Sequence, residues 1–220
     1  YYKDHSGAPE KIEVPMLSAG NWGGQGLHPR GNIEGYLAAG SKQKWLEMHG
    51  DTHFTLFYAK QGEDLQKRFF GHFLKGEDTG WEDQPPVELQ IRYPNETFVR
   101  RAESEWPLAR TQWTKFYPNP GTSDLSENEP TSSTELTYET TSDGLFFSTP
   151  PMTQPMELTG PVAAKLWVSS DTTDADLFLA LRVMDPDDKE VTFIGSNDPR
   201  TPVGLGWLRA SQRKLDTSKT

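Results

Sequence analysis

Hydrophobic residues recur at helical spacing over residues 61–74 of the chain. Leu65, Phe69 and Phe73 follow one another every four residues, which places their side chains on one face of a helix. An aromatic stripe of this kind is typical of a helix that packs against a core. We therefore predict an amphipathic helix here, and Gly76 is expected to end it.

Three further elements are predicted before this helix. Residues 12–18 and 45–48 carry the large apolar side chains of short strands, and residues 31–39 have apolar positions on one side of a helix that ends at Gly40. The loop at residues 19–26 is rich in glycine, but no Gly-Lys-Ser/Thr follows it, so a phosphate-binding P-loop is not expected. The order strand, helix, strand, helix is typical of the end of an α/β sheet.

Short strands replace the helical pattern after residue 80. Residues 80–86 end in Pro-Pro and predict a linker, and residues 118–133 predict a long loop. Strands are expected at residues 87–93, 97–101, 111–117, 135–140, 145–148, 162–169, 176–184 and 190–194, and residues 206–215 begin as a further strand. Many short strands separated by turns predict an antiparallel sandwich of jelly-roll type. The fold class expected is therefore α/β followed by all-β.

The composition indicates a folded chain that binds neither nucleic acid nor membrane. Its 220 residues include seven Trp, seven Tyr and eleven Phe, which bury large areas. The net charge of -10 opposes binding to nucleic-acid phosphates, and no apolar run approaches the ~20 residues of a membrane helix. The absence of cysteine excludes disulfides, thiol nucleophiles and cysteine-based zinc sites. The location of the protein is unknown, with the cytoplasm as the expectation, and a homo-oligomer stays open.

The stretch from Lys44 to His53 holds the candidate catalytic residue. Gly50 breaks the strand predicted at residues 45–48, and a short loop brings His53 to the carboxyl end of that strand. Ligands gather at the carboxyl ends of strands in open α/β sheets. An imidazole with an ordinary pKa of ~6.5 takes and returns a proton near neutral pH, so His53 is a candidate general base. The alternative, an ordinary loop histidine, stays open.

Several segments, taken in their order along the chain, resemble the X-Pro dipeptidyl-peptidase and cocaine-esterase-like (CocE/NonD) serine hydrolases. These segments are residues 12–17, 30–32, 44–46, 69–76, 105–110, 158–162, 172–177 and 206–209, together with the loop to His53. The resemblance implies that residues 1–80 are the C-terminal part of an α/β-hydrolase domain. It implies that residues 81–220 are a jelly-roll (galactose-binding-like) β-sandwich, truncated at its C-terminal end.

The resemblance also assigns roles within the catalytic site. It aligns His53 with the catalytic histidine of the family and places the Gly-x-Ser-x-Gly nucleophile elbow upstream of Tyr1. We therefore expect the chain, which does not begin with Met, to be a piece of a longer hydrolase and to be inactive alone. Its partners would be a small-molecule ester or peptide substrate and the missing N-terminal part of the hydrolase domain.

The catalytic acid is where this chain departs from the family. The family pattern is Gly-Gly-Trp-Tyr-Asp, and residues 20–24 read Gly-Asn-Trp-Gly-Gly, so that Gly24 stands where the Asp is expected. No carboxylate lies between Trp22 and Gly31, and Asp51 and Glu34, the nearest substitutes, cannot be assigned. A triad without its acid loses orders of magnitude in rate.

Other polar clusters are interpreted as ordinary surface or core groups, so no metal and no cofactor are expected. Acidic turns could offer oxygen ligands to calcium, but they lack the spacing of an EF-hand; they contain Asp171, Asp174, Asp176, Asp185, Asp187 and Asp188. Three other histidines have no ligand spacing with His53; they are His28, His49 and His72. Asn95 begins a glycosylation sequon, and Trp22 and Phe54 are candidates to line a substrate pocket or to pack in the core.

Two functions therefore remain open from the sequence. In the first, the chain carries the catalytic His53 of a serine hydrolase of the esterase or dipeptidyl-peptidase type, with His53 as base and later as acid. In the second, the sandwich is a non-catalytic binding or interaction module, for a glycan or another subunit, and the hydrolase remnant is a scaffold.

Overall fold

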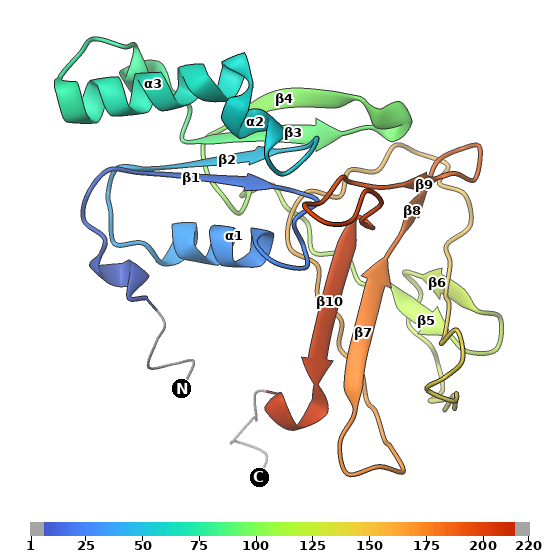
Figure 1. Ribbon diagram of the computed structural model, residues 1–220. Coiled ribbons are helices and arrows are strands. Elements are labelled where there is room, and N and C mark those ends of the chain that lie inside the picture. Colours follow the sequence, from blue (N-terminus) through green and yellow to red (C-terminus); the bar gives the residue numbers. More distant parts are fainter. Residues whose placement is uncertain (1–6, 214–220) are drawn as a thin grey trace. The chain divides into compact units, whose positions relative to one another are not determined.

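The computed structural model describes residues 7–213 of the chain (Figure 1). The opening Tyr1 and the last two residues of the strand expected at residues 206–215 lie outside this range. The chain divides into two compact units. The larger contains the residues up to Leu108 and those from Pro161 onwards, and the smaller is Ala109–Gly160.

A four-stranded sheet in the order β1-β2-β3-β4 forms the first part of the larger unit. Its strands are β1 (Met16–Asn21), β2 (Lys44–His49), β3 (Val87–Arg92) and β4 (Phe98–Glu103). The strands β1, β2 and β3 are parallel, and β4 runs antiparallel to β3. The connecting helices are α1 (Pro29–Ala38), α2 (Thr55–Tyr58) and α3 (Lys60–Lys75). Figure 1 shows α1 on one face of the sheet and α3 on the opposite face.

The helices begin and end where local chemistry predicts. Pro29 occupies the first turn of α1, where its missing N–H costs no helical hydrogen bond. Gly76 ends α3 in the left-handed region at φ 67°, which a residue without a Cβ adopts freely. The helices predicted at residues 31–39 and 61–74 and the strand at residues 45–48 are confirmed. The first strand lies later than predicted, because it starts after Pro15 and runs on to Asn21.

Two apolar clusters, one on each face, hold the sheet together. Alternate strand residues point to opposite faces, so Leu46 and Met48 pack under Tyr36 of α1 while Trp45 packs against α3. The cluster on the α1 face also contains Val87, Leu89, Trp106 and Leu108. The cluster on the α3 face is built from Leu65, Phe69 and Trp81, with Leu17, Trp45 and Phe73 around them.

The prediction of a linker at residues 80–86 was wrong. Residues Trp81–Asp83 form a 3-10 helix, η3, and Trp81 is only 1% exposed. Its ring lies edge-on to Trp45 at 5.2 Å and to Phe69 at 5.1 Å between centroids. A turn-rich sequence thus carries a core residue, because the aromatic area that Trp81 buries outweighs the polar character of its neighbours.

Two strands beyond residue 80 extend the sheet that β1 and β2 begin. The strands predicted at residues 87–93 and 97–101 are confirmed as β3 and β4. Leu46 of β2 pairs with Val87 of β3, so the sheet continues across the predicted domain boundary. The boundary itself stays a prediction.

Antiparallel ribbons make up the rest of the described chain. In the larger unit, β7 (Asp176–Leu181) pairs with β10 (Gly204–Arg209), and β8 (Val183–Met184) pairs with β9 (Glu190–Val191). In the smaller unit, β5 (Tyr117–Asn119) pairs with β6 (Asp124–Ser126) inside the predicted loop. Short 3-10 helices are η2 (Pro9–Lys11), η4 (Pro94–Glu96) and η5 (Ala210–Gln212). The chain is thus mostly β with few helices, and no helix within residues 7–213 is long and apolar enough to cross a membrane.

Four predicted strands are wrong or reduced to fragments. Residues 135–140 and 162–169 have no strand, residues 145–148 keep one bridge, and only Tyr117 of residues 111–117 is in a strand. The cause is pairing, because a strand must satisfy its backbone groups against a neighbour. No described strand lies beside residues 162–169, whose Trp167 is 85% exposed. The jelly-roll sandwich therefore stays a prediction.

We predict that Trp81→Ala lowers the free energy of unfolding of this chain by about 3–5 kcal/mol, because it leaves a cavity among Trp45 and Phe69. The measurement is denaturant unfolding followed by circular dichroism. Trp167→Ala is the matched control, since the Trp167 side chain already lies in solvent. Equal effects of the two substitutions would contradict the packing described above.

Candidate functional site

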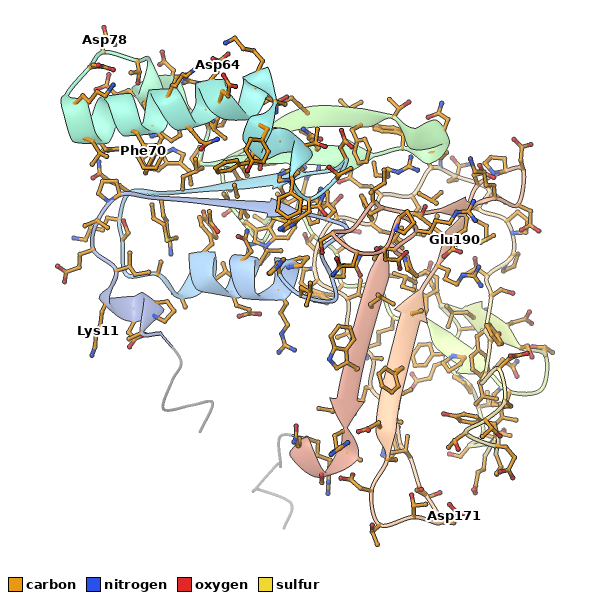
Figure 2. The ribbon with its side chains drawn as sticks, viewed as in Figure 1. Lys11, Asp64, Phe70, Asp78, Asp171 and Glu190 are labelled. Carbon is orange, nitrogen blue, oxygen red and sulfur yellow. The ribbon has the colours of Figure 1, made fainter. Side chains whose placement is uncertain are left out.

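A cleft of about 390 Å³ opens at the carboxyl end of β1. Its walls come from the end of β1, the loop after it, the first turn of α1 and the loop after β2. They are Ala19, Gly20, Asn21, Leu27, His28, Gly31, Asn32 and His53. The structure therefore brings His53 to the place that the strand pattern predicts, and it adds His28, which the sequence did not single out for this cleft. Figure 2 draws the side chains over the ribbon in the same view.

Two imidazole rings stack at one wall of the cleft. The centroids of His28 and His53 are 4.9 Å apart, and the planes are inclined by 21°. The rings of Phe54 and His53 are nearly perpendicular, with their centroids 4.8 Å apart, so this candidate pocket residue packs beside His53. Trp22, the second candidate, does not line the cleft. It packs against the core cluster next to Trp106 at 6.2 Å.

The surroundings of His53 favour a neutral imidazole. Burial lowers the pKa of His53, and electrostatic repulsion from the imidazoles of His28 and His49 lowers it further. A neutral ring at neutral pH can accept a proton, as a general base must. Its Nδ1 atom is buried and has no hydrogen-bond partner among residues 7–213.

The two carboxylates considered from the sequence as substitutes for the catalytic acid do not form a hydrogen bond with the His53 ring. Asp51 is exposed, and its Oδ1 accepts a hydrogen bond from the backbone N–H of Thr52 at 2.7 Å. Glu34 lies on the exposed side of α1 and is not a wall residue of the cleft. Gly24 donates its N–H to the carbonyl of Asn21 at 3.1 Å and closes a tight turn. The acid position that the family pattern expects is thus occupied by a backbone turn.

A buried acid–imidazole pair in β2 was not predicted from the sequence. Nδ1 of His49 is 2.8 Å from Oε2 of Glu47, and the two residues are 6% and 2% exposed. Burial raises the pKa of Glu47, while the hydrogen bond and charge of His49 and the charge of Arg100 lower it. Residues two apart on a strand share a face, so the Glu-x-His spacing in β2 was the available signal.

The loop that carries His53 is fixed by side chains from both neighbours of β2. On one side, Nδ2 of Asn21 donates to the carbonyls of Asp51 at 2.7 Å and Gly50 at 3.4 Å. On the other side, Oε1 of Gln90 accepts the backbone N–H of Gly50 at 3.1 Å. His53 therefore follows a backbone segment that is tied to β1 and to β3.

The other candidate groups serve local structure. Asp174 accepts hydrogen bonds from Ser211, and Asp176 pairs with Arg209. Asp185 accepts hydrogen bonds from the backbone N–H groups of Asp187 and Lys189 in its own acidic turn. Within residues 7–213 no three His, Asp or Glu side chains are grouped so that they could hold a metal ion. His72 packs edge-on to Phe73 at 4.6 Å, away from the cleft, and Asn95 of the sequon is exposed in η4.

Comparison with known proteins identifies what the chain is similar to. The family model of the X-Pro dipeptidyl-peptidase C-terminal non-catalytic domain matches residues 79–220. Cocaine esterase from Rhodococcus sp. (strain MB1 Bresler) is 26% identical over 170 residues, which cover 60% of this chain and 29% of the esterase.

Two crystal structures of a CocE/NonD family hydrolase from Staphylococcus aureus are also similar to this chain. For the first, the TM-score is 0.83 and the identity is 27%, and the match covers 100% of this chain and 40% of the hydrolase chain. For the second, the TM-score is 0.82 and the identity is 28%, and the match covers 99% of this chain and 40% of the hydrolase chain. The chain thus spans well under half the length of the relatives it matches.

The Glu47–His49 pair generates a prediction about stability and pH. A carboxyl whose pKa is raised in the folded state supports folding below its ordinary value of 4.5 and loses that contribution as the pH rises through the raised value. Glu47→Gln keeps a hydrogen-bonding group beside His49 and removes the titration. We expect the stability of the variant, relative to wild type, to improve as the pH rises from 4.5 towards 7.

Denaturant unfolding at several pH values checks this expectation. Glu82→Gln, at an exposed position, removes one charge without burial and is the control. If the stability difference between Glu47→Gln and wild type did not change with pH, burial would not raise the pKa of the Glu47 carboxyl.

Proposed function

Because this chain belongs to the family of the X-Pro dipeptidyl-peptidase C-terminal non-catalytic domain, we propose that it is part of a serine hydrolase in which His53 is the general base. The resemblance to CocE/NonD hydrolases that the sequence indicates is confirmed by the comparisons. The observation that carries the proposal is the structural match over 100% of the chain, which includes the His53 loop as well as the non-catalytic part.

The proposed reaction is hydrolysis of a small-molecule ester or peptide substrate. His53 takes the proton of a serine hydroxyl as that oxygen attacks the substrate carbonyl, and it returns the proton to the leaving group. The pKa of His53, which burial lowers, keeps the ring neutral for the first of these steps. No Gly-x-Ser-x-Gly elbow occurs in the 220 residues, so the nucleophile in this proposal comes from outside them.

The lack of a described carboxylate at Nδ1 of His53 shapes the expected activity. In a complete triad the acid holds the tautomer of the imidazole, and its loss costs several orders of magnitude in rate. Here the neighbour of the ring is another imidazole, His28, and Nδ1 of His53 has no partner among the described residues. We therefore propose either a weak hydrolase or one whose acid lies outside this chain.

The domain organisation is part of the same proposal. Residues 1–80 are the C-terminal part of the α/β-hydrolase domain, and residues 81–220 are a jelly-roll sandwich. The start of the family match at residue 79 supports this boundary. The parallel pairing of β1 with β2, with α1 between them, supports the hydrolase part.

A second proposal rests on the description of the matched family as non-catalytic. Residues 79–220 are then a binding or interaction module, and the residues before them are a scaffold. It is favoured because no carboxylate among residues 7–213 forms a hydrogen bond with Nδ1 of His53. Binding of a glycan by the chain, together with no esterase activity in the full-length protein, would support this second proposal over the first.

We predict that His53→Ala lowers kcat/KM of the full-length protein for an activated phenyl ester by about 10²–10⁴-fold, the usual contribution of a general base. His72→Ala is the control, because His72 packs on α3 and does not line the cleft. Steady-state kinetics and the rate of labelling by a fluorophosphonate are the measurements. Equal kcat/KM values for wild type and His53→Ala would show that His53 is not the general base. If the fluorophosphonate did not label the wild-type protein, a serine nucleophile would be rejected.

The stacked His28 supplies a prediction about pH. Besides burial, the positive charge of His28 lowers the pKa of His53. His28→Phe keeps a ring against His53 and removes the charge, so the pKa of His53 should rise. We expect the acid limb of the kcat/KM profile of the full-length protein to move to higher pH.

His28→Gln, which removes both the ring and the charge, is the matched variant. It should move the acid limb in the same direction if charge is responsible. An acid limb that is the same in wild type and in both variants would show that His28 does not act on the titration of His53.

A further inference from the structure

One hydrogen bond joins the part of the chain matched as non-catalytic to the loop of the candidate base. Gln90 lies in β3, within residues 79–220, and its Oε1 accepts the N–H of Gly50 at 3.1 Å. Gly50 is the first residue after β2 and lies three residues before His53. The contact therefore acts on the backbone that leads directly to the ring.

The position of Gln90 is itself well defined. Its neighbours Val87 and Leu89 on β3 are fully buried on the opposite face, which anchors the strand. The carbonyl of Gln90 accepts the indole N–H of Trp22 at 2.9 Å, and its backbone pairs with Arg100 on β4. Because β3 is fixed by these contacts, the Gln90 side chain can restrain the loop after β2.

The Gly50 backbone also rests on an aromatic ring from β4. A Cβ on Gly50 would overlap the ring of Phe98, so only glycine permits this approach. Phe98 is supported in turn by Phe193, at 6.2 Å between ring centroids, and by the guanidinium of Arg92 at 5.4 Å. The loop is thus blocked on the β4 side.

Asn21 completes the restraint from the opposite side. It is 2% exposed, and its side-chain Nδ2 donates to the backbone carbonyls of Gly50 and Asp51. The loop lies between Asn21 on one side and Gln90 with Phe98 on the other. No described residue forms a hydrogen bond with Nδ1 of His53, so the ring is placed by its contacts with His28 and Phe54 and by this backbone restraint.

We infer that Gln90 is a positioning residue for His53, so that the part of the chain matched as non-catalytic contributes to the catalytic geometry. This inference rests on the proposed function of His53 as general base. Gln90 does not line the cleft. It acts by accepting the Gly50 N–H, which fixes where the imidazole meets the nucleophile.

The test compares two substitutions of nearly the same size in the full-length protein. Gln90→Met removes the acceptor, and we expect kcat to fall about 10–100-fold with KM little changed, because misplacing a reacting group by about 1 Å costs up to ~10²-fold. Gln90→Glu keeps an oxygen that accepts the same N–H and should restore most of kcat at a pH where His53 is neutral. Gln112→Met, at an exposed position, is the control.

A double-substitution cycle shows whether Gln90 acts through His53. In a His53→Ala background, Gln90→Met should cause no further loss, since the group that it positions is absent. If Gln90→Met does not fold, Gln90→Asn, which shortens the side chain by one methylene, replaces it in the same cycle with the same expected direction.

The outcomes separate this inference from the proposed function. A full loss in Gln90→Glu as well as in Gln90→Met, or an undiminished loss in the His53→Ala background, would overturn the positioning role. So would wild-type kcat in Gln90→Met. If His53→Ala itself left the activity unchanged, the proposed function would fail first, and the inference with it.

Discussion

Parallel pairing of β2 between β1 and β3 is the constraint on which the site depends. Parallel strands bring their carboxyl ends to one edge of a sheet. Here that edge presents Asn21 on one side of the loop after β2, and Gln90 projects from β3 on the other. Neither contact exists unless the apolar clusters on both faces hold the three strands in register. The chemistry proposed for His53 therefore begins with the packing of Trp81, Phe69 and their counterparts under α1.

The environment of His53 lowers the pKa of the ring, as a general base requires, but it provides no described carboxylate to fix the tautomer. Burial and neighbouring imidazoles lower the pKa of the ring, which keeps it ready to accept a proton. The same surroundings offer no described carboxylate to Nδ1, so the tautomer is not fixed by a charged partner. Backbone restraint of the loop compensates for position, but it does not stabilise an imidazolium.

Local signals in the sequence predicted the parts of the structure that local physics determines. The four-residue spacing of Leu65, Phe69 and Phe73 predicted α3, and Gly76 predicted its end. Other parts of the structure depend on contacts with residues that are distant in the sequence. Trp81 became core because α3 packs over it, and residues 162–169 formed no strand because no described strand pairs with them. The same limit applies to the site, where the sequence placed His53 at a strand end but could not show the contact between Gln90 and Gly50.

The most direct measurement is a crystal structure of the full-length protein after reaction with a fluorophosphonate, which fixes the nucleophile covalently. The account predicts a phosphonylated serine whose Oγ lies within about 3 Å of a ring nitrogen of His53, the reach expected of a nucleophile and its base. A labelled serine with His53 turned away from it, or with another histidine in that place, would contradict the account.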